Sequence, residues 1–109
     1  MSKPWRLTRQ AEASLTEIAL WTLDTFGQRQ AAAYEQDLIE RCAGIASGTV
    51  VSRGCQQFID PNLPEDLRFC RCGGHFIVFV ESEDAVIVLD FLHARSDLPR
   101  RLAELPRSG

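Results

Sequence analysis

The chain has 109 residues, 45% of them hydrophobic, and its 12 Lys and Arg against 15 Asp and Glu leave a formal net charge of −3 at pH 7. This length indicates one domain, residues 1–109, and this composition excludes intrinsic disorder. The acidic balance disfavours broad, salt-driven nucleic-acid binding, and no direct sequence-specific nucleic-acid binding is expected. The lack of a signal peptide or a membrane-length apolar run predicts a cytoplasmic protein without membrane association.

The first part of the chain predicts a short strand and then two helices. Residues 4–9 alternate weakly, and Thr8 can cap the helix that follows. This helix should end at Gly27, because glycine tolerates left-handed geometry, and a second helix is expected over residues 28–46. A single glycine between two amphipathic helices predicts a tight antiparallel hairpin. Its inner face is expected to carry Ala11, Leu15, Ile18, Thr22, Phe26, Ala31, Tyr34, Leu38, Cys42 and Ile45.

The second part predicts an irregular segment followed by three strands. Residues 47–64 contain two glycines and two prolines without a period, which indicates a loop with room for a short helical turn. Strands are expected over residues 67–72, 75–81 and 85–93, and Gly73–Gly74 is a strong hairpin signal.

The tail, about residues 97–109, predicts one short helix that Asp97 or Ser96 caps, with Pro99 in its first turn. The element order is therefore β-α-α-β-β-β-(α). We expect an α+β fold in which the helix hairpin packs on one face of an antiparallel sheet.

Two of the predicted strands are apolar on both faces. His75–Val80 and Ala85–Phe91 lack the polar face that a free antiparallel hairpin would show. The helix hairpin covers one face of the sheet, and the short C-terminal helix covers only part of the other. We expect a partner protein to bind the remaining apolar surface, with a helix in a groove or an added strand. The alternative is that the tail and residues 47–64 cover it completely.

Polar side chains near the predicted sheet are candidates for a second kind of site. Arg68 can hold an anionic group, or it can form a structural ion pair with Asp90 or Glu65. His93 is a candidate acid–base group, but a structural, hydrogen-bonded role at the end of a strand is the simpler interpretation.

The C-terminal segment carries the remaining charged candidates. Arg95 and Asp97 can pair with each other or cap the last helix. Arg100 and Arg101 are most simply explained as the solvated face of that helix.

The four cysteines are expected to be reduced thiols in a cytoplasmic protein. Cys70 and Cys72 share one strand face, and a tetrahedral metal site can be drawn with His75 and His93. Their spacing is not the C-x₂-C of structural zinc sites, and no second pair exists. Small buried hydrophobic residues are therefore the favoured interpretation, and neither a metal nor another cofactor is expected.

Five segments carry a resemblance to a known family: LTRQA, SLTEIALW, QAAAYEQDLIERC, LPEDLRFCRCGGHFIVFVES and VLDFLHARSDLPRRL. In this order they resemble the ParE branch of the RelE/ParE superfamily, the toxins of bacterial type II toxin–antitoxin systems. Arg68 matches the arginine on the sheet of that family. His93, Arg95 and Asp97 match its closing LH-x-R-x-D motif.

The resemblance implies a toxin that inhibits DNA gyrase, leaving cleaved DNA complexes, and that is not itself an enzyme. It also implies a ParD-like antitoxin that neutralises the toxin in a hetero-oligomeric complex, encoded in an operon that stabilises plasmids or responds to stress. Candidates for toxicity or target binding are Arg68, His93, Arg95, Arg100 and Arg101. Candidates for antitoxin binding are Leu15, Trp21, Phe76, Val78, Val86 and Val88.

Two other functions stay open. A ribosome-dependent mRNA endonuclease of the RelE type would use Arg68 to hold a phosphate and His93 as an acid–base group. Against it, the loop before the strands offers only Arg53, and the single tyrosine, Tyr34, is on a helix. The other possibility is a non-toxic member that only joins an antitoxin complex.

Overall fold

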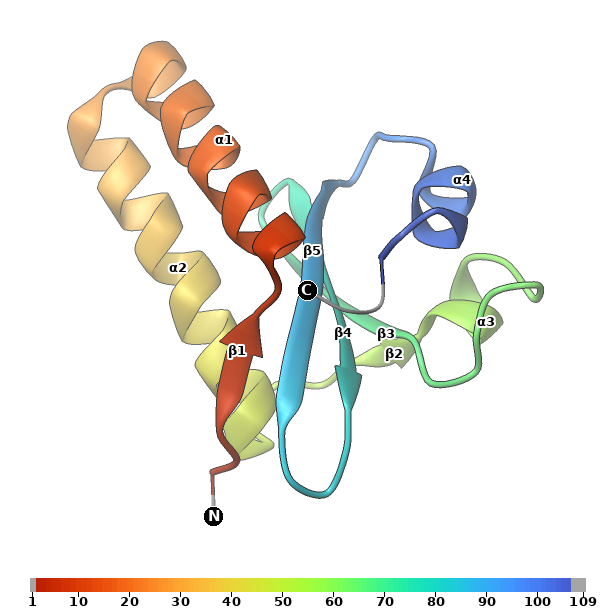
Figure 1. Cartoon of the computed structure of the whole chain (residues 1–109). Helices are drawn as coiled ribbons and strands as arrows, with labels where there is room; N and C mark the ends of the chain where they lie inside the picture. The colour runs from red at the N-terminus through yellow and green to blue at the C-terminus, as the bar shows by residue number, and fades with distance from the viewer. Residues whose placement is uncertain (1, 107–109) are drawn as a thin grey trace.

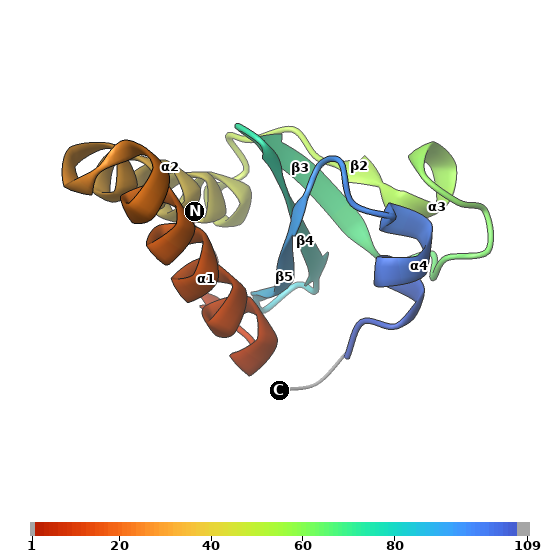
Figure 2. The same ribbon diagram turned by 90° about the horizontal axis from the view of Figure 1, so that it is seen from above.

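Five strands form one sheet, and helices lie on both of its sides, in the computed structural model, which describes residues 2–106. Helices α1 and α2 cover one face, and α3 and α4 lie over the other (Figures 1 and 2). Of the predicted tail, residues 107–109 lie outside the described part of the chain. The elements are β1 (Trp5–Leu7), α1 (Arg9–Phe26), α2 (Gln28–Ser47), β2 (Arg53–Gly54), α3 (Cys55–Phe58), β3 (Arg68–Cys72), β4 (His75–Glu81), β5 (Val86–His93) and α4 (Leu98–Ala103).

The sheet has the strand order β1-β5-β4-β3-β2. Strands β2 to β5 pair antiparallel with their neighbours, whereas β1 pairs with β5 in parallel, with Trp5 opposite Val86. A parallel pair needs a long crossover, and the elements from α1 to β4 supply it. The predicted α+β class with a helix hairpin on one face is confirmed. The sheet is mixed rather than wholly antiparallel, because the first strand joins the last one.

The helix hairpin begins and turns where the sequence predicts. The Thr8 hydroxyl oxygen accepts a hydrogen bond from the backbone N–H of Ala11 (3.1 Å) and caps α1. Gly27, with φ of +94°, separates α1 from α2. This conformation strains any residue with a Cβ, so glycine is what allows the two helices to follow each other directly.

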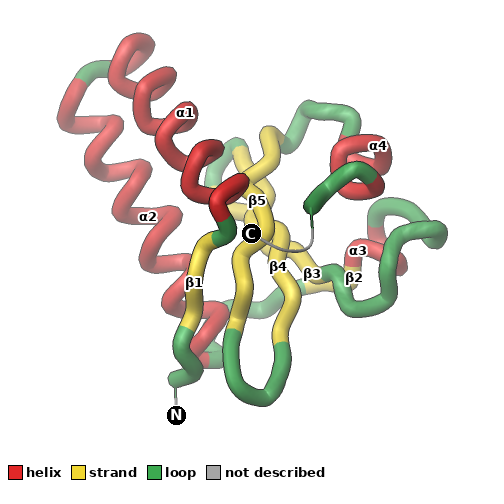
Figure 3. Tube along the Cα trace, in the orientation of Figure 1, coloured by secondary structure: helices red, strands yellow, loops and turns green. Residues whose placement is uncertain are grey.

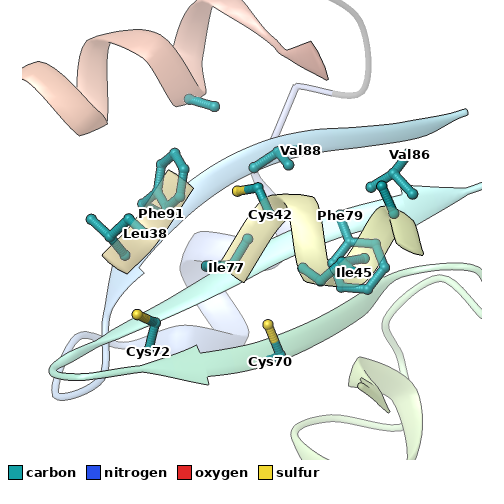
Figure 4. Close-up of a cluster of buried hydrophobic side chains, with 12 residues drawn as sticks. Leu38, Cys42, Ile45, Cys70, Cys72, Ile77, Phe79, Val86, Val88 and Phe91 are labelled. Atoms are coloured by element: carbon teal, nitrogen blue, oxygen red, sulfur yellow. The ribbon is translucent and has the colours of Figure 1, made fainter. Parts of the chain in front are cut away.

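One hydrophobic cluster fills the space between the helix hairpin and the sheet (Figure 4). Leu38, Cys42 and Ile45 come from α2 and pack on side chains of β3, β4 and β5. The α2 stripe at helical spacing is thus confirmed as the inner face of that helix. The sheet contributes Cys70, Cys72, Ile77, Phe79, Val86, Val88 and Phe91 to this cluster.

A second cluster lies on the opposite face of the sheet. Helices α3 and α4 and the segment that follows α3 lie on that side (Figure 3). Leu63 and Leu67 come from the segment between α3 and β3, and Leu102 of α4 is 3% exposed. The expectation that much of this face stays exposed is therefore wrong. The alternative, in which the loop and the tail fold over it, describes the observed structure. The sheet residues buried in this cluster are Phe69, Val78, Leu89 and Leu92.

One carboxylate is buried between α1 and β5. Asp90 is 2% exposed, and it accepts hydrogen bonds from the hydroxyl of Ser14 and from the backbone N–H of Phe91 (2.8 Å). Burial raises the pKa of Asp90, and these two hydrogen bonds only partly offset that effect. The predicted ion pair between Asp90 and Arg68 is not what satisfies this carboxylate.

Asp90 should give the folded chain a characteristic pH dependence. Because its pKa is raised on folding, its stabilisation is full below the ordinary value of 3.8 and is lost as the pH rises through the folded value. The Asp90→Asn variant cannot ionise there. The free energy of unfolding, wild type minus variant, should therefore fall as the pH rises above 3.8 toward neutral pH. Urea unfolding across this range measures it, and a flat or rising difference would contradict the assignment.

Candidate functional site

Exposed apolar side chains gather on the C-terminal half of α1, not on the sheet. Trp21 is 59% exposed and Phe26 is 57% exposed, and their rings meet edge to face with centroids 5.8 Å apart. Leu20 and Leu23 are exposed on the same helix. Large exposed aromatic residues that lie close together are typical of a surface that binds another molecule.

The residues expected to bind an antitoxin are distributed unevenly over the fold. Trp21 is exposed, while Leu15 and Phe76 are partly buried against the two clusters. The prediction of free apolar surface at three other positions is wrong. Val78, Val86 and Val88 are all fully buried, because the helix hairpin covers the last two and the α3–α4 side covers the first.

A pocket of about 530 Å³ lies beside Trp21, at the end of the sheet. Its walls come from both helices of the hairpin and from the ends of β4 and β5. His75 and His93 lie directly opposite each other in the β4–β5 register, with ring centroids 5.4 Å apart. The residues that line the pocket are Trp21, Thr22, Phe26, Gln30, Tyr34, Gly74, His75 and His93.

On one side of this pocket, Tyr34 links α2 to the ends of β3 and β4 by hydrogen bonds. Its hydroxyl donates to the backbone carbonyl of Cys72 (2.9 Å) and lies 2.7 Å from Nδ1 of His75. Burial raises the pKa of Tyr34, and burial together with the nearby His93 lowers the pKa of His75. A neutral phenol and a neutral imidazole therefore face each other at pH 7.

The sequence does not predict Tyr34 as a residue of this site, because it lies on a helix and not near a strand end. The position did carry a signal, since Tyr34 is one turn before Leu38 on the predicted inner face. A long side chain there reaches the end of the sheet, where the Gly73–Gly74 turn meets it. Pairing a helix residue with a turn needs the three-dimensional register, which periodicity alone does not supply.

Gly73 gives a direct test of this contact. A Cβ added there would lie 2.7 Å from Cε1 of Tyr34, and the residue has a φ of +59°. Gly73→Ala should cost about 1–3 kcal/mol of unfolding free energy, from left-handed strain and displacement of the ring. Gly74→Ala is the matched control, because its Cβ would meet nothing within 4 Å. Chemical denaturation compares the two, and equal losses would refute the tight contact.

The side chain of Arg68 is hydrogen-bonded to the loop that precedes β2. Its Nε donates to the Ser52 hydroxyl (2.8 Å) and its terminal nitrogen donates to the Ser52 carbonyl (3.0 Å). The predicted pairing with Asp90 or Glu65 is thus replaced by a clamp on Ser52. The arginine also lies away from the pocket. Arg68 is opposite Phe79 in the register, four residues along β4 from His75, or about 13 Å away.

The basic residues of the C-terminal segment do not join the pocket. Arg100 lies 3.7 Å from Glu104, and both side chains are largely exposed, so this pair adds little stability. Arg101 is also exposed on α4, in agreement with the prediction that it lies on a solvated helix face. Arg95 touches the pocket only through its backbone, because its N–H donates to Nδ1 of His93 (3.0 Å).

The cysteines are buried in the packed core, as expected of small hydrophobic residues. Cys42, Cys70 and Cys72 lie in the helix-side cluster, and Cys55 lies in the other one. Burial raises the pKa of Cys42 to about 12 and that of Cys70 to about 11, so both stay protonated thiols at neutral pH. Within residues 2–106, no three His, Cys, Asp or Glu side chains are grouped to hold a metal ion.

None of the described helices combines the length and the apolar character needed to span a bilayer. The longest, α2, carries charged residues throughout, among them Glu35, Asp37, Glu40 and Arg41.

Comparison with known proteins gives the family. The sequence matches the family described as the ParE toxin of the type II toxin–antitoxin system, parDE, over residues 5–98. A solved chain described as "Chromosomal ParDE TA system from P. aeruginosa" has the same fold, with a TM-score of 0.69 and 16% sequence identity. The alignment covers 86% of this chain and 98% of that one. No curated protein matches the sequence. The chain belongs to the ParE toxin family of type II toxin–antitoxin systems.

Proposed function

We propose that this chain is a toxin that inhibits DNA gyrase by binding it, and that a cognate ParD-like antitoxin neutralises it in a hetero-oligomeric complex. The observation that carries the proposal is the family match over residues 5–98. The proposed site of action is the cytoplasm, where gyrase works, and the proposed biological role is plasmid stabilisation or a stress response.

The test is a supercoiling assay with purified gyrase and relaxed plasmid DNA. Purified toxin at micromolar concentration should block supercoiling and leave cleaved DNA, and the antitoxin should relieve both effects. An active gyrase control that is indifferent to micromolar toxin would count heavily against the proposal. If expression of the chain alone also leaves growth unaffected, the non-toxic alternative takes its place.

For the antitoxin, the exposed part of α1 is the proposed contact, with Trp21 at its centre and Leu15 earlier on the same helix. Phe76, the third candidate, lies on the other face of the sheet against the second cluster. These three of the expected residues keep some accessible surface. Among the charged candidates for the gyrase contact, His93, Arg95, Arg100 and Arg101 are exposed, whereas Arg68 is engaged with Ser52.

The RelE-type endonuclease stays the second candidate because of one observation. Tyr34, His75 and His93 lie together, and all three can move protons. Arg68, the expected phosphate clamp, is about 13 Å from them along β4. Primer extension on mRNA from induced cells separates the candidates. Codon-positioned cleavage that His93→Ala abolishes would support the nuclease.

A further inference from the structure

The two histidines at the floor of the pocket have defined hydrogen-bonding roles. The Tyr34 hydroxyl has one proton, and it lies 2.9 Å from the Cys72 carbonyl, which can only accept. That proton is therefore used on Cys72. The 2.7 Å contact between Tyr34 and Nδ1 of His75 must then be a donation from the imidazole N–H. Neutral His75 consequently carries its free lone pair on Nε2.

The donor and acceptor nitrogens of His93 are reversed relative to those of His75. The backbone N–H of Arg95 can only donate, and it lies 3.0 Å from Nδ1 of His93. Nδ1 is therefore the acceptor, and the proton of the neutral ring is on Nε2. The pair thus offers the pocket one acceptor, on His75, and one donor, on His93.

A hydroxyl group is the smallest complement to this pair, because one oxygen both donates and accepts. Both rings line the pocket, and their centroids are 5.4 Å apart. Aromatic walls from Trp21, Phe26 and Tyr34 suit a flat apolar ring attached to that hydroxyl. We propose that the pocket binds the side chain of a tyrosine presented by a partner protein, with its hydroxyl between the two imidazoles.

A polypeptide fits this site better than a free phenol because two further depressions adjoin the pocket along α2. Phe26, Gln30 and Tyr34 also line a neighbouring depression along α2, which extends to Asp37. Tyr34 and Asp37 in turn line a third one, which reaches Gly44 and the β3–β4 turn. From Gln30 to Gly44 α2 rises about 21 Å, so a chain leaving the pocket has a path along this helix.

The test compares two soluble probes that differ by one hydroxyl, N-acetyl-tyrosinamide and N-acetyl-phenylalaninamide, on the full chain. The protein has two histidines, so its NMR spectrum contains only two imidazole Cε1–H signals, and both report on this pocket. The tyrosine probe should shift both signals saturably. It should bind about tenfold more tightly than the phenylalanine probe, which is about 1.4 kcal/mol.

Variants separate recognition of the tyrosine hydroxyl from nonspecific apolar binding of the ring. His93→Phe should reduce the tyrosine probe to the affinity of the phenylalanine probe, and circular dichroism checks that this exposed substitution leaves the fold intact. Trp21→Ala should weaken both probes, while Leu20→Ala, exposed on the same helix but outside the pocket, should weaken neither. Equal affinity for the two probes, unshifted histidine signals, or a tyrosine preference that survives in His93→Phe would each overturn the proposal. None of these results depends on whether gyrase is the target.

Discussion

Replacing Phe79 by aspartate should leave the chain unfolded at 25 °C. Phe79 is fully buried in the helix-side cluster, between Ile45 of α2 and the neighbouring strands (Figure 4). Losing a buried phenyl ring costs about 3–5 kcal/mol. A buried carboxylate without a partner adds several more kcal/mol. Together these costs are comparable with the about 5–15 kcal/mol that keeps a typical domain folded.

Far-UV circular dichroism and urea unfolding of the purified variant measure this effect. Phe79→Leu is the control for lost volume alone, and it should stay folded with a lower urea midpoint. Arg71→Asp places the same charge on the exposed side of the neighbouring strand and should leave the midpoint nearly unchanged. A cooperative transition for Phe79→Asp near that of the wild type would mean that this core is not packed as described.

Ending the chain after Ala94 should destabilise it by several kcal/mol and abolish growth arrest. From the sequence, the tail is the most adaptable exposed element, so its removal should cost toxicity while antitoxin binding partly survives. The structure gives another cause. Leu98, Leu102 and Leu105 cover the second cluster, and loss of a buried leucine such as Leu102 alone costs about 2–5 kcal/mol. Denaturant unfolding and a growth assay together measure the two effects.

The double variant Arg100→Ala, Arg101→Ala separates stability from recognition. Both side chains are exposed, so the urea midpoint should stay close to that of the wild type. If these arginines contact the target, growth arrest weakens in a fully folded protein. Arrest at wild-type strength would remove them from the target-binding candidates. A truncated chain with an unchanged midpoint would refute the covering role of α4.

The periodic parts of the sequence predict most of the fold. Residues such as Leu38, Cys42 and Ile45 recur every three or four positions. Thr8 marks a helix start with its capping hydroxyl, and Gly27 marks a helix end because it lacks a Cβ. The alternation along β4 also holds. Ile77 and Phe79 face the helix hairpin, and Val78 faces the other cluster. These features are local, so they can be read without knowing what else the chain does.

The features that the sequence does not predict are contacts between residues far apart in the chain. Leu63 lies in a segment without a period and Leu67 at the start of a predicted strand, so nothing marks either residue as a cover for the second face of the sheet. The partner of Arg68 is Ser52, an uncharged loop residue sixteen positions away, whereas charge matching points to Asp90 or Glu65. The contact between Tyr34 and His75 joins a helix to a strand end across 41 positions. Each of these contacts depends on the path that the loops and turns follow in three dimensions.

The cover that this chain supplies to both faces of its own sheet has a consequence for timing in the cell. A polypeptide that completes its own interior needs no companion to stay intact, so it should resist intracellular proteases after any antagonist has been degraded. Under the proposed function, that difference in lifetime is what would let the toxin act when synthesis of both proteins stops.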